Sequence, residues 1–355
     1  MKARIIEGLD GLGALGTAWA TLEQNAFLPM QHFIWSQAGA AAFTRDGELR
    51  LLVLEEGDDV AAIAPLVQRK ERHCLEFLAM EEFFEPTDVL CGRSEAMPAL
   101  AKALVDLKIP LRLRRLPADS PLPEALAKAF RGRGALVCRP DDGWPWVSLN
   151  SKWEEPENQL KAGRRSDFRR AQRKANEMGD VTTDIVTPTL ETLPALLEEA
   201  LKVEAASWKG ETGSALALDK KRGTFYHQYA AAACGKGIFR LCFLRIGGET
   251  AAMQIAVESG GSLWLLKIGY DNKFARCSPG NLLMRESLRY AAKRGLQSLE
   301  FLGAVEPWIR VWTDLERPCV AVRGYPWGWR GGAALATDLA KSITQKILRL
   351  EKTTK

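Results

Sequence analysis

Histidine is scarce in this chain, with three residues in 355. So few imidazoles argue against a histidine-rich metal site, and we expect no bound metal. The seven cysteines are scattered and include no Cys-x-x-Cys pair. Cys74, Cys138 and Cys242 fall within apolar runs, where a thiol behaves as a small buried hydrophobe. The sequence therefore predicts neither a disulfide framework nor a cysteine-bound metal.

Long apolar runs are also missing. No run approaches the roughly 20 residues that span a bilayer, and the N-terminus lacks the charged-then-apolar pattern of a signal peptide. A hydrophobic content of 46% with 26% charged residues is ordinary for a soluble globular protein. We therefore expect a cytoplasmic protein, and 355 residues suit two domains rather than one compact unit.

The clearest pattern lies in residues 238–312, where strand-like runs alternate with glycine turns. The runs and turns are 238–246, Gly247-Gly248, 250–258, Gly260-Gly261 and 263–270. Two-residue glycine turns between β-prone runs predict hairpins. Ser278-Pro279-Gly280-Asn281 then opens an apolar-periodic helix over 282–293, and a last strand is expected over 299–303. A polar turn at a helix start presents free backbone N–H groups to an anion such as phosphate.

This part of the chain resembles a known family. The matching pieces are Glu204-Ala205-Ala206-Ser207-Trp208-Lys209-Gly210, Phe225-Tyr226, 267–271, Ser278-Pro279-Gly280 with Leu282-Leu283, and Phe301-Leu302-Gly303 before Glu306 and Trp312. Their order resembles the GNAT acyltransferase fold. Their amino-acid sequence resembles the BioF2-like acetyltransferase domain of bacterial proteins labelled cellulose-biosynthesis-associated acetyltransferases. This family includes bacterial ceramide synthases. The family has Tyr-Lys where this chain has Trp308-Ile309, so that lysine is absent here.

The first 145 or so residues alternate strands and helices, and they resemble a degenerate copy of the same unit. The expected elements are helices over 12–25, 38–43, 96–107 and 123–131, a hairpin of 49–55 with 60–68, and strands over 73–79, 87–91, 111–116, 135–139 and 144–149. Two GNAT-like lobes in tandem also resemble the FemABX peptidyltransferases. The predicted fold class is α/β (α+β): two tandem GNAT-like lobes, each a mixed, mostly antiparallel sheet flanked by helices.

The expected domain boundaries follow from this reading. We place a degenerate GNAT-like lobe at 1–150, a basic linker helix at 151–180, the GNAT acyltransferase lobe at 181–325 and a basic amphipathic helix at 326–355.

Two segments concentrate positive charge. The helix expected over 161–178 carries seven Lys and Arg residues up to Lys174 against one acid, Asp167. It is either a solvated face or an element that contacts CoA phosphates, anionic lipid or RNA. In the tail, Trp327 and Trp329 precede a helix expected over 333–351, with an apolar stripe and flanking lysines. That helix either docks on its own domain or lies on anionic lipid.

The resemblance and the residue types together suggest roles. In the GNAT fold two central strands part to admit the acyl-thioester arm, and we assign these strands to 263–270 and 299–303. Glu306 is the first candidate for general base and Glu300 the second. Tyr270 either protonates the leaving thiolate or is a packed aromatic bonded to Asp271. A covalent route through Cys277 is less attractive, because no histidine is close in sequence.

The remaining candidates bind the two substrates. The donor side comprises Lys267, Ser278, Pro279, Gly280 and Asn281, and the acceptor side comprises Glu204, Trp208, Lys209, Asp271, Arg310 and, from the first lobe, Asp88. Glu204 interrupts an apolar stripe, so it either pairs with Lys209 or another cation or reaches the acceptor. Trp208 is either core or a platform for ligand.

The function expected from the resemblance is N-acyl transfer. The donor would be acyl-CoA or acyl carrier protein as co-substrate, with no permanently bound cofactor. The acceptor would be an amine of an envelope lipid or polysaccharide precursor, with a preference for a long-chain amine, as in ceramide synthesis. The alternatives are acetylation of an amino sugar in exopolysaccharide synthesis, FemABX-like transfer from aminoacyl-tRNA, and an inactive scaffold. We expect peripheral contact with the anionic inner membrane and no DNA partner, and tRNA is the less favoured partner.

Overall fold

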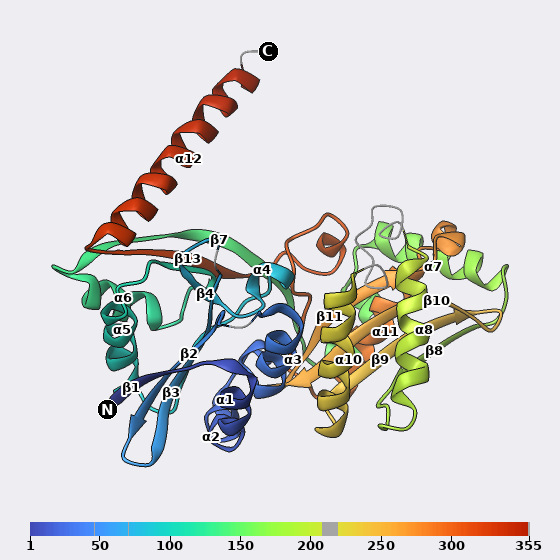
Figure 1. The fold of residues 1–355 in the computed structure, drawn as a ribbon. Coiled ribbons are helices and arrows are strands. Elements are labelled where there is room, and N and C mark those ends of the chain that lie inside the picture. Colours follow the sequence, from blue (N-terminus) through green and yellow to red (C-terminus); the bar gives the residue numbers. More distant parts are fainter. Residues whose placement is uncertain (46, 70, 208–218, 354–355) are drawn as a thin grey trace. The chain divides into compact units, whose positions relative to one another are not determined.

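The computed structural model describes residues 1–45, 47–69, 71–207 and 219–353 (Figure 1). They form two compact units. Unit 1 comprises Met1–Gln24, Thr44–Asp142 and Pro318–Lys355, and unit 2 comprises Asn25–Phe43 and Gly143–Arg317. Strands β7 (Gly134–Ser148) and β13 (Glu316–Pro326) each have residues in both units.

Unit 1 is a mostly antiparallel sheet with helices against it. Its strands follow the order β1-β2-β3-β4-β6-β13, with β7 beside β13 and β5 beside β3, and the β4–β6 pair is parallel. The strands are β1 (Lys2–Ile6), β2 (Leu49–Glu56), β3 (Asp59–Gln68), β4 (Leu75–Phe77), β5 (Leu90–Cys91) and β6 (Leu111–Pro117). The helices are α1 (Gly8–Ala14), α2 (Gly16–Leu22), α4 (Met80–Phe83), α5 (Ala96–Asp106), α6 (Leu122–Phe130) and α12 (Trp329–Thr353).

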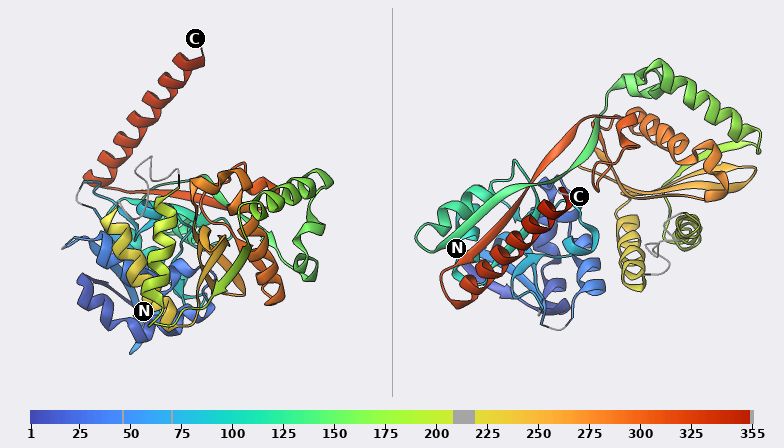
Figure 2. Two further views of the ribbon diagram at one scale, coloured as in Figure 1. Left: turned by 90° about the vertical axis from the view of Figure 1, so that its right-hand side faces the viewer. Right: turned by 90° about the horizontal axis from the view of Figure 1, so that it is seen from above.

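Unit 2 is a second mixed sheet, in the order β7-β12-β11-β10-β9-β8, with only the β11–β12 pair parallel. Its strands are β8 (Val181–Val186), β9 (Phe239–Ile246), β10 (Glu249–Ser259), β11 (Ser262–Tyr270) and β12 (Ser298–Glu300). Its helices are α3 (Phe33–Phe43), α7 (Ala162–Asn176), α8 (Leu193–Ala205), α10 (Lys220–Gly235) and α11 (Pro279–Lys293). Helices α7 and α11 cover one face, and α8 and α10 lie on the other (Figure 2).

The glycine turns set the hairpins of unit 2. Gly247 and Gly248 have φ of +60° and +82°, and Gly260 and Gly261 have φ of +58° and +72°. A two-residue turn with both φ positive matches the twist of the strands it joins, and glycine adopts it without steric cost. The β9–β10–β11 meander is therefore confirmed, as are the β2–β3 hairpin and the predicted fold class.

The compact units differ from the expected boundaries in three segments, of which the first is 143–180, which lies wholly in unit 2. Residues 25–43 belong to unit 2, where the ring of Trp35 lies edge-on to Phe225 at 4.8 Å and to Tyr229 at 5.2 Å. Residues from Pro318 onward return to unit 1, because β13 pairs with β6 through Val320 and Leu116. Long-range pairing of this kind leaves no local signal in the sequence.

Some single elements also differ from expectation. The helix expected over 12–25 is two helices, α1 and α2, and the strands expected over 135–139 and 144–149 are one strand, β7. The strand expected over 299–303 ends at Glu300. Strands β1, β8 and β13 were not predicted.

Candidate active site

Strands β11 and β12 diverge in the middle of unit 2. They pair over three register positions, of which the last joins Trp264 to Glu300, and β11 then continues to Tyr270. Shortly after β12, Leu302 and Gly303 take left-handed backbone angles, with φ of +58° and +56°. Such angles are incompatible with a strand, so the chain turns out of the ladder. The predicted divergence of the two strands is confirmed.

A bulge marks β11 where the divergence begins. The register of β11 against β10 skips Leu266, which is therefore the extra residue. The hydroxyl of Tyr226, on α10, donates to the Leu266 carbonyl at 3.1 Å. A bulge redirects the side chains beyond it, so Tyr226 helps to fix the far half of β11.

Lys267 and Glu204 form an ion pair beside this bulge. Lys267 Nζ lies 3.0 Å from Glu204 Oε1, and the Glu204 side chain is fully buried. Gly269 allows this approach, because a Cβ there would lie 3.1 Å from the Cα of Glu204. A buried carboxylate needs such a cation. Lys267, expected on the donor side, thus pairs with Glu204, expected on the acceptor side. This ion pair ties α8 to β11. Trp208 and Lys209 lie outside the described residues.

The start of α11 offers few free amides. Ser278 has a left-handed φ of +50°, and its own N–H donates to the Ala275 carbonyl at 3.0 Å. Pro279 has no N–H, and the Asn281 amide donates back to the Ser278 carbonyl at 3.0 Å. Within this described turn, the Gly280 amide alone donates to no backbone carbonyl. A phosphate here would depend on side-chain cations more than on backbone amides.

Those cations come from α7. A cavity of about 300 Å³ lies between α7 and the start of α11. It is lined by Arg164, Asp167, Phe168, Arg170, Ala171, Lys174, Arg276, Ser278, Asn281 and Val311. Four of the lining residues are Lys or Arg. Asp167 pairs with two of them, Arg170 at 2.7 Å and Arg164 at 3.7 Å, so one carboxylate is shared by two cations. The fold thereby joins the basic helix and the predicted phosphate turn in one anion-attracting cavity, here named the α7 cavity.

Glu300 is held by a set of buried donors. Its carboxylate is fully buried and accepts from Trp144 Nε1 at 2.8 Å, Ser298 Oγ at 2.6 Å and Arg317 Nη2 at 2.7 Å. The Arg317 guanidinium in turn lies 4.0 Å from the centre of the Trp146 ring. A carboxylate with this many donors is suited to fixing the strands where β11 and β12 still pair, rather than to accepting a proton.

Glu306 is the exposed acid of this region. Its Oε2 accepts from Trp308 Nε1 at 2.7 Å, which orients the carboxylate and leaves it open to solvent. Arg310, also exposed, lies 3.5 Å from Asp314. The two residues share the segment that follows the diverging strand, as the sequence predicted. Their roles stay predictions.

Tyr270 and Asp271 lie at the far end of β11. The ring of Tyr270 is near the helix start, because a Cβ on Gly280 would lie 3.8 Å from its Cδ1. Asp271 instead caps the following 3₁₀ turn by accepting from the Lys273 amide at 2.9 Å. The structure therefore places Tyr270 between the diverging strand and the α11 turn.

Cys277 is not placed as a nucleophile. It is buried, its Sγ donates to the Phe274 carbonyl at 3.0 Å, and burial raises the pKa of its thiol. A thiol, unlike a thiolate, is a poor nucleophile. This agrees with the expectation that a covalent route through Cys277 is the less attractive one.

Asp88 lies in unit 1, just before β5. Burial raises its pKa to about 6, although hydrogen bonds from the Ser120 side chain and the Val89 amide act in the opposite direction. Its predicted contribution to the acceptor side stays a prediction.

Three residues of this region had no role in the sequence reading: Tyr226, Trp144 and Arg317. Tyr226 was visible only as part of a matching motif. Trp144 reaches Glu300 across 156 positions of the chain, so no local spacing could reveal the contact.

The described ranges hold no cluster of three or more His, Cys, Asp or Glu side chains placed to bind a metal ion. None of their helices has an apolar stretch of bilayer-spanning length. The seven cysteines are free thiols.

Comparison with known proteins identifies the domain. Residues 162–310 match the family model described as Acetyltransferase (GNAT) domain. The match indicates a GNAT-type domain in this part of the chain, and the protein is an acyltransferase. No curated protein matches the sequence significantly.

Solved structures share the fold along almost the whole chain. One is the C-terminal domain of a protein assigned as a lysylphosphatidylglycerol synthetase from Agrobacterium fabrum, at 13% identity and a TM-score of 0.58, covering 94% of this chain and 96% of that one. FemX is similar at 12% identity and a TM-score of 0.57, covering 92% and 97%. L-PGS from Bacillus licheniformis is similar at 12% identity and a TM-score of 0.54, covering 86% and 90%. At these identities the likeness concerns the fold, and nothing in it supports the expected ceramide-synthase subtype.

Proposed function

We propose that this protein transfers an aminoacyl group from tRNA to an acceptor of the cell envelope. The α7 cavity carries the proposal, because it supplies cations where the α11 turn supplies few amides. The FemABX resemblance implies an aminoacyl-tRNA donor. The name lysylphosphatidylglycerol synthetase, borne by a protein of similar fold, describes an aminoacyl group joined to a phospholipid. This reading replaces acyl-CoA-dependent ceramide synthesis as the first hypothesis.

The length of α7 favours a polyanion over a single diphosphate. The helix has 15 residues and is therefore about 22 Å long. It carries six Lys and Arg residues, at 164, 165, 169, 170, 173 and 174, and Arg164, Arg170 and Arg173 are each more than half exposed. A diphosphate would occupy two or three of these cations, whereas a nucleic-acid backbone can contact more of them along the helix.

The proposed reaction is acyl transfer from an ester. The acceptor nucleophile attacks the aminoacyl carbonyl, a new bond forms to carbon, and the bond from carbon to the ribose oxygen breaks. We assign removal of the nucleophile's proton to Glu306, directly or through a water. Tyr270, beside the α11 turn, is the candidate to return a proton to the leaving oxygen. Glu300 and the Lys267–Glu204 pair hold the diverging strand in place.

Charge removal from α7 tests the donor. In the variant Arg164→Ala/Arg170→Ala/Lys174→Ala we expect tRNA affinity to fall at least tenfold at low salt. The slope of log affinity against log salt concentration should become less negative by about 2 to 3. Each phosphate contact that is lost removes the release of about one counterion. Filter binding of uncharged and aminoacylated tRNA at several salt concentrations measures both quantities.

A matched variant separates this site from general charge. Lys128→Ala/Arg131→Ala/Lys293→Ala removes three exposed cations from other helices or their ends, so its salt slope should equal that of the native protein. Equal loss in both variants, or no tRNA binding by the native protein at low salt, would contradict an RNA donor.

Acyl-CoA is the second candidate donor, with transfer to a long-chain amine or an amino sugar. The observation in its favour is the divergence of β11 and β12, which a GNAT-fold enzyme uses for an acyl-thioester arm. A bound acyl-CoA at one hundred times its dissociation constant would stabilise the protein by about 2.7 kcal/mol. A thermal shift with acyl-CoA and none with tRNA would select this alternative.

We also propose that the tail contacts anionic membrane at the cytoplasmic face. Trp327 and Trp329 are 62% and 79% exposed, and the Arg330 guanidinium lies 5.3 Å from the Trp329 ring centre. Residues 323–355 hold seven Lys and Arg against two acids, a formal +5 that equals the net charge of the entire chain. Exposed tryptophans beside excess cations are typical of interfacial binding.

Liposome flotation tests the tail. The variant Trp327→Ala/Trp329→Ala should bind less to vesicles with anionic lipid. Its partition constant should fall about tenfold, because the variant lacks two large apolar groups that leave water on binding. As a control, Leu9→Ala/Leu190→Ala removes two other exposed apolar side chains and should float like the native protein. Equal flotation of both variants and the native protein would remove the membrane proposal.

A further inference from the structure

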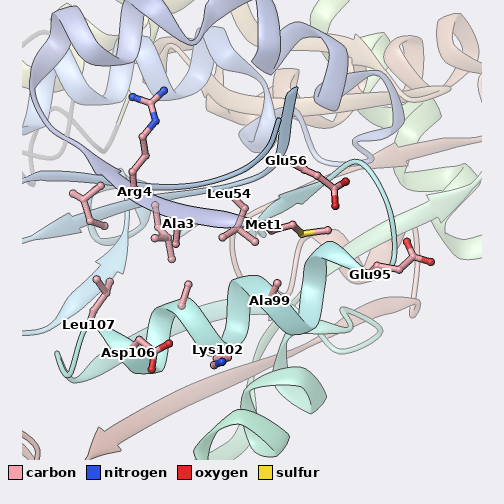
Figure 3. Close-up of a pocket in the computed structure, with 13 residues that line it drawn as sticks. Met1, Ala3, Arg4, Leu54, Glu56, Glu95, Ala99, Lys102, Asp106 and Leu107 are labelled. Atoms are coloured by element: carbon pink, nitrogen blue, oxygen red, sulfur yellow. The ribbon is translucent and has the colours of Figure 1, made fainter. Parts of the chain in front are cut away.

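Two cavities of the molecule differ in the charge of their walls. The larger, of about 660 Å³, lies in unit 1 between β1–β2 and α5 (Figure 3). Its charges balance and select no class of ligand. They are three acids and three cations: Glu56, Glu95, Asp106, Arg4, Lys102 and the Met1 amino group. The α7 cavity of unit 2 has four lining cations against one acid, and two of its apolar lining residues, Phe168 and Val311, connect it to the segment that carries Glu306.

Residues 306–312 form a short and well-ordered turn. The Ile309 N–H donates to the Glu306 carbonyl at 3.0 Å, and the Trp312 N–H donates to the Ile309 carbonyl at 2.8 Å. Two successive bonds between residues three apart make a compact 3₁₀ turn, which is assigned over Ile309–Val311. The backbone of Glu306 is thereby fixed relative to that of Trp312.

Trp312 packs this turn against α7. Its side chain is 5% exposed and lies edge-on to the Phe168 ring, with the centroids 5.2 Å apart and the planes at 65°. An edge-to-face contact of this kind stabilises beyond the area it buries. Phe168 belongs to α7, which supplies most of the cations of the α7 cavity, and Val311 lines the same cavity next to Trp312. The cavity wall and the Glu306 turn therefore form one packed unit.

The indole of Trp312 is placed by packing rather than by a polar bond. Its Nε1 is buried and has no hydrogen-bond partner among the residues that the structure describes. A buried indole N–H usually finds a partner, so this one gives the ring no polar anchor. Trp308, in contrast, donates its indole N–H to Glu306 at 2.7 Å. One tryptophan of the segment orients the carboxylate, and the other contacts α7.

We propose that Trp312 is a positioning residue for the transfer reaction, holding Glu306 at a fixed distance from a donor phosphate in the α7 cavity. This inference rests on the proposed function, in which the α7 cavity binds the donor and Glu306 removes the acceptor's proton. A reacting group displaced by about 1 Å can cost about 10²-fold in rate. Donor affinity resides mainly in phosphate contacts, so the Trp312–Phe168 contact should affect rate more than affinity.

Replacing the ring tests this role in the full-length protein. Trp312→Leu should lower the single-turnover rate by about tenfold to a hundredfold and leave the dissociation constant for tRNA within about threefold of native. Trp312→Phe keeps a ring for the contact with Phe168, so its rate should stay within about threefold. The probe is bulk radiolabelled aminoacyl-tRNA, with a bacterial membrane extract as the source of acceptor. As a matched control, Phe239→Leu removes a fully buried ring of β9 that does not line the α7 cavity and should change neither quantity.

A double variant shows whether Trp312 acts through Glu306. In the Glu306→Gln background, Trp312→Leu should lower the rate by less than about threefold further, because the group that it positions is already lost. Multiplication of the two single effects would overturn the inference. Native turnover by Glu306→Gln would reject the proposed base and this inference with it. A native rate in Trp312→Leu, with Glu306→Gln inactive, would reject the inference alone.

The indole resonance of Trp312 gives a readout that needs no turnover. Protein labelled with ¹⁵N-tryptophan is titrated with inorganic pyrophosphate, and the resonance is assigned by its loss in Trp312→Phe. Occupation of the α7 cavity should shift it, because Phe168 and Val311 belong to both the cavity wall and the surroundings of the ring. The resonance of Trp264, whose Nε1 donates to the Ser259 carbonyl at 3.0 Å, should not move.

Two further results would overturn the inference. They are a fall in tRNA affinity as large as the fall in rate, and an unmoved Trp312 resonance at millimolar pyrophosphate. If Trp312→Leu melts at a lower temperature, Phe168→Leu breaks the same contact from α7 and takes its place. It must show the same separation of rate from affinity, and its absence would reject the positioning role.

Discussion

Replacing Glu306 by glutamine should lower kcat by about 10² to 10⁴, the range for loss of a positioned general base. The amide oxygen can still accept from Trp308 Nε1, so the local geometry is retained while the basic group is lost. We therefore expect donor binding to stay within about twofold of native, since no positive charge of the α7 cavity is altered. Single-turnover transfer from radiolabelled aminoacyl-tRNA, measured together with filter binding, separates the two effects.

The control for this prediction is Asp314→Asn. Asp314 is an exposed acid of the same segment and pairs with Arg310 at 3.5 Å. Its loss should leave kcat nearly unchanged, because exposed pairs contribute little. Retained turnover in Glu306→Gln would move the proton-handling role to another group, and Tyr270→Phe would be the next variant to assay.

The second large effect concerns stability. Arg317→Ala should lower the free energy of unfolding by about 3 to 5 kcal/mol, because it leaves the fully buried Glu300 carboxylate without its cation. The loss of Arg317 also removes a guanidinium packed on the Trp146 ring. Urea unfolding followed by tryptophan fluorescence reports on this region directly, since Trp144 and Trp146 both contact the pair.

A double variant checks the cause. In Arg317→Met/Glu300→Gln no charge is left buried, so most of the lost stability should return. Lys128→Ala, which breaks the exposed pair with Glu124, should cost less than about 1 kcal/mol and serves as the surface reference. A similar small loss for Arg317→Ala would show that the Glu300 cluster does not hold the strands together.

The Glu300 cluster also illustrates how far sequence reasoning reaches into the site. A glutamate next to a phenylalanine in a strand indicates that one side chain faces a pocket and the other a core layer. Both side chains are buried, and the partners that hold Glu300 there, Trp144 and Arg317, approach from other strands. The candidate base and the structural carboxylate could thus be recognised as a pair of acids, but not told apart.

The phosphate site shows a related limit. The Ser278 turn was expected to bind an anion, and the basic helix to be either a solvated face or an anion-contacting element. Their meeting in the α7 cavity is a property of the packed sheet, with α7 and α11 on the same face (Figure 2). The shortage of free amides in the turn also depends on backbone angles, above all the left-handed Ser278.

The sequence by itself determined the features that short-range chemistry controls. Paired glycines fixed the hairpins of unit 2, apolar periodicity indicated α11, and the ordered motifs indicated a GNAT acyltransferase. Tertiary structure decided the rest, including the return of β13 to unit 1 and the buried donors that hold Glu300. The reason is physical: hairpins and helices form through contacts between near neighbours, whereas these features arise between residues that only the folded chain brings together.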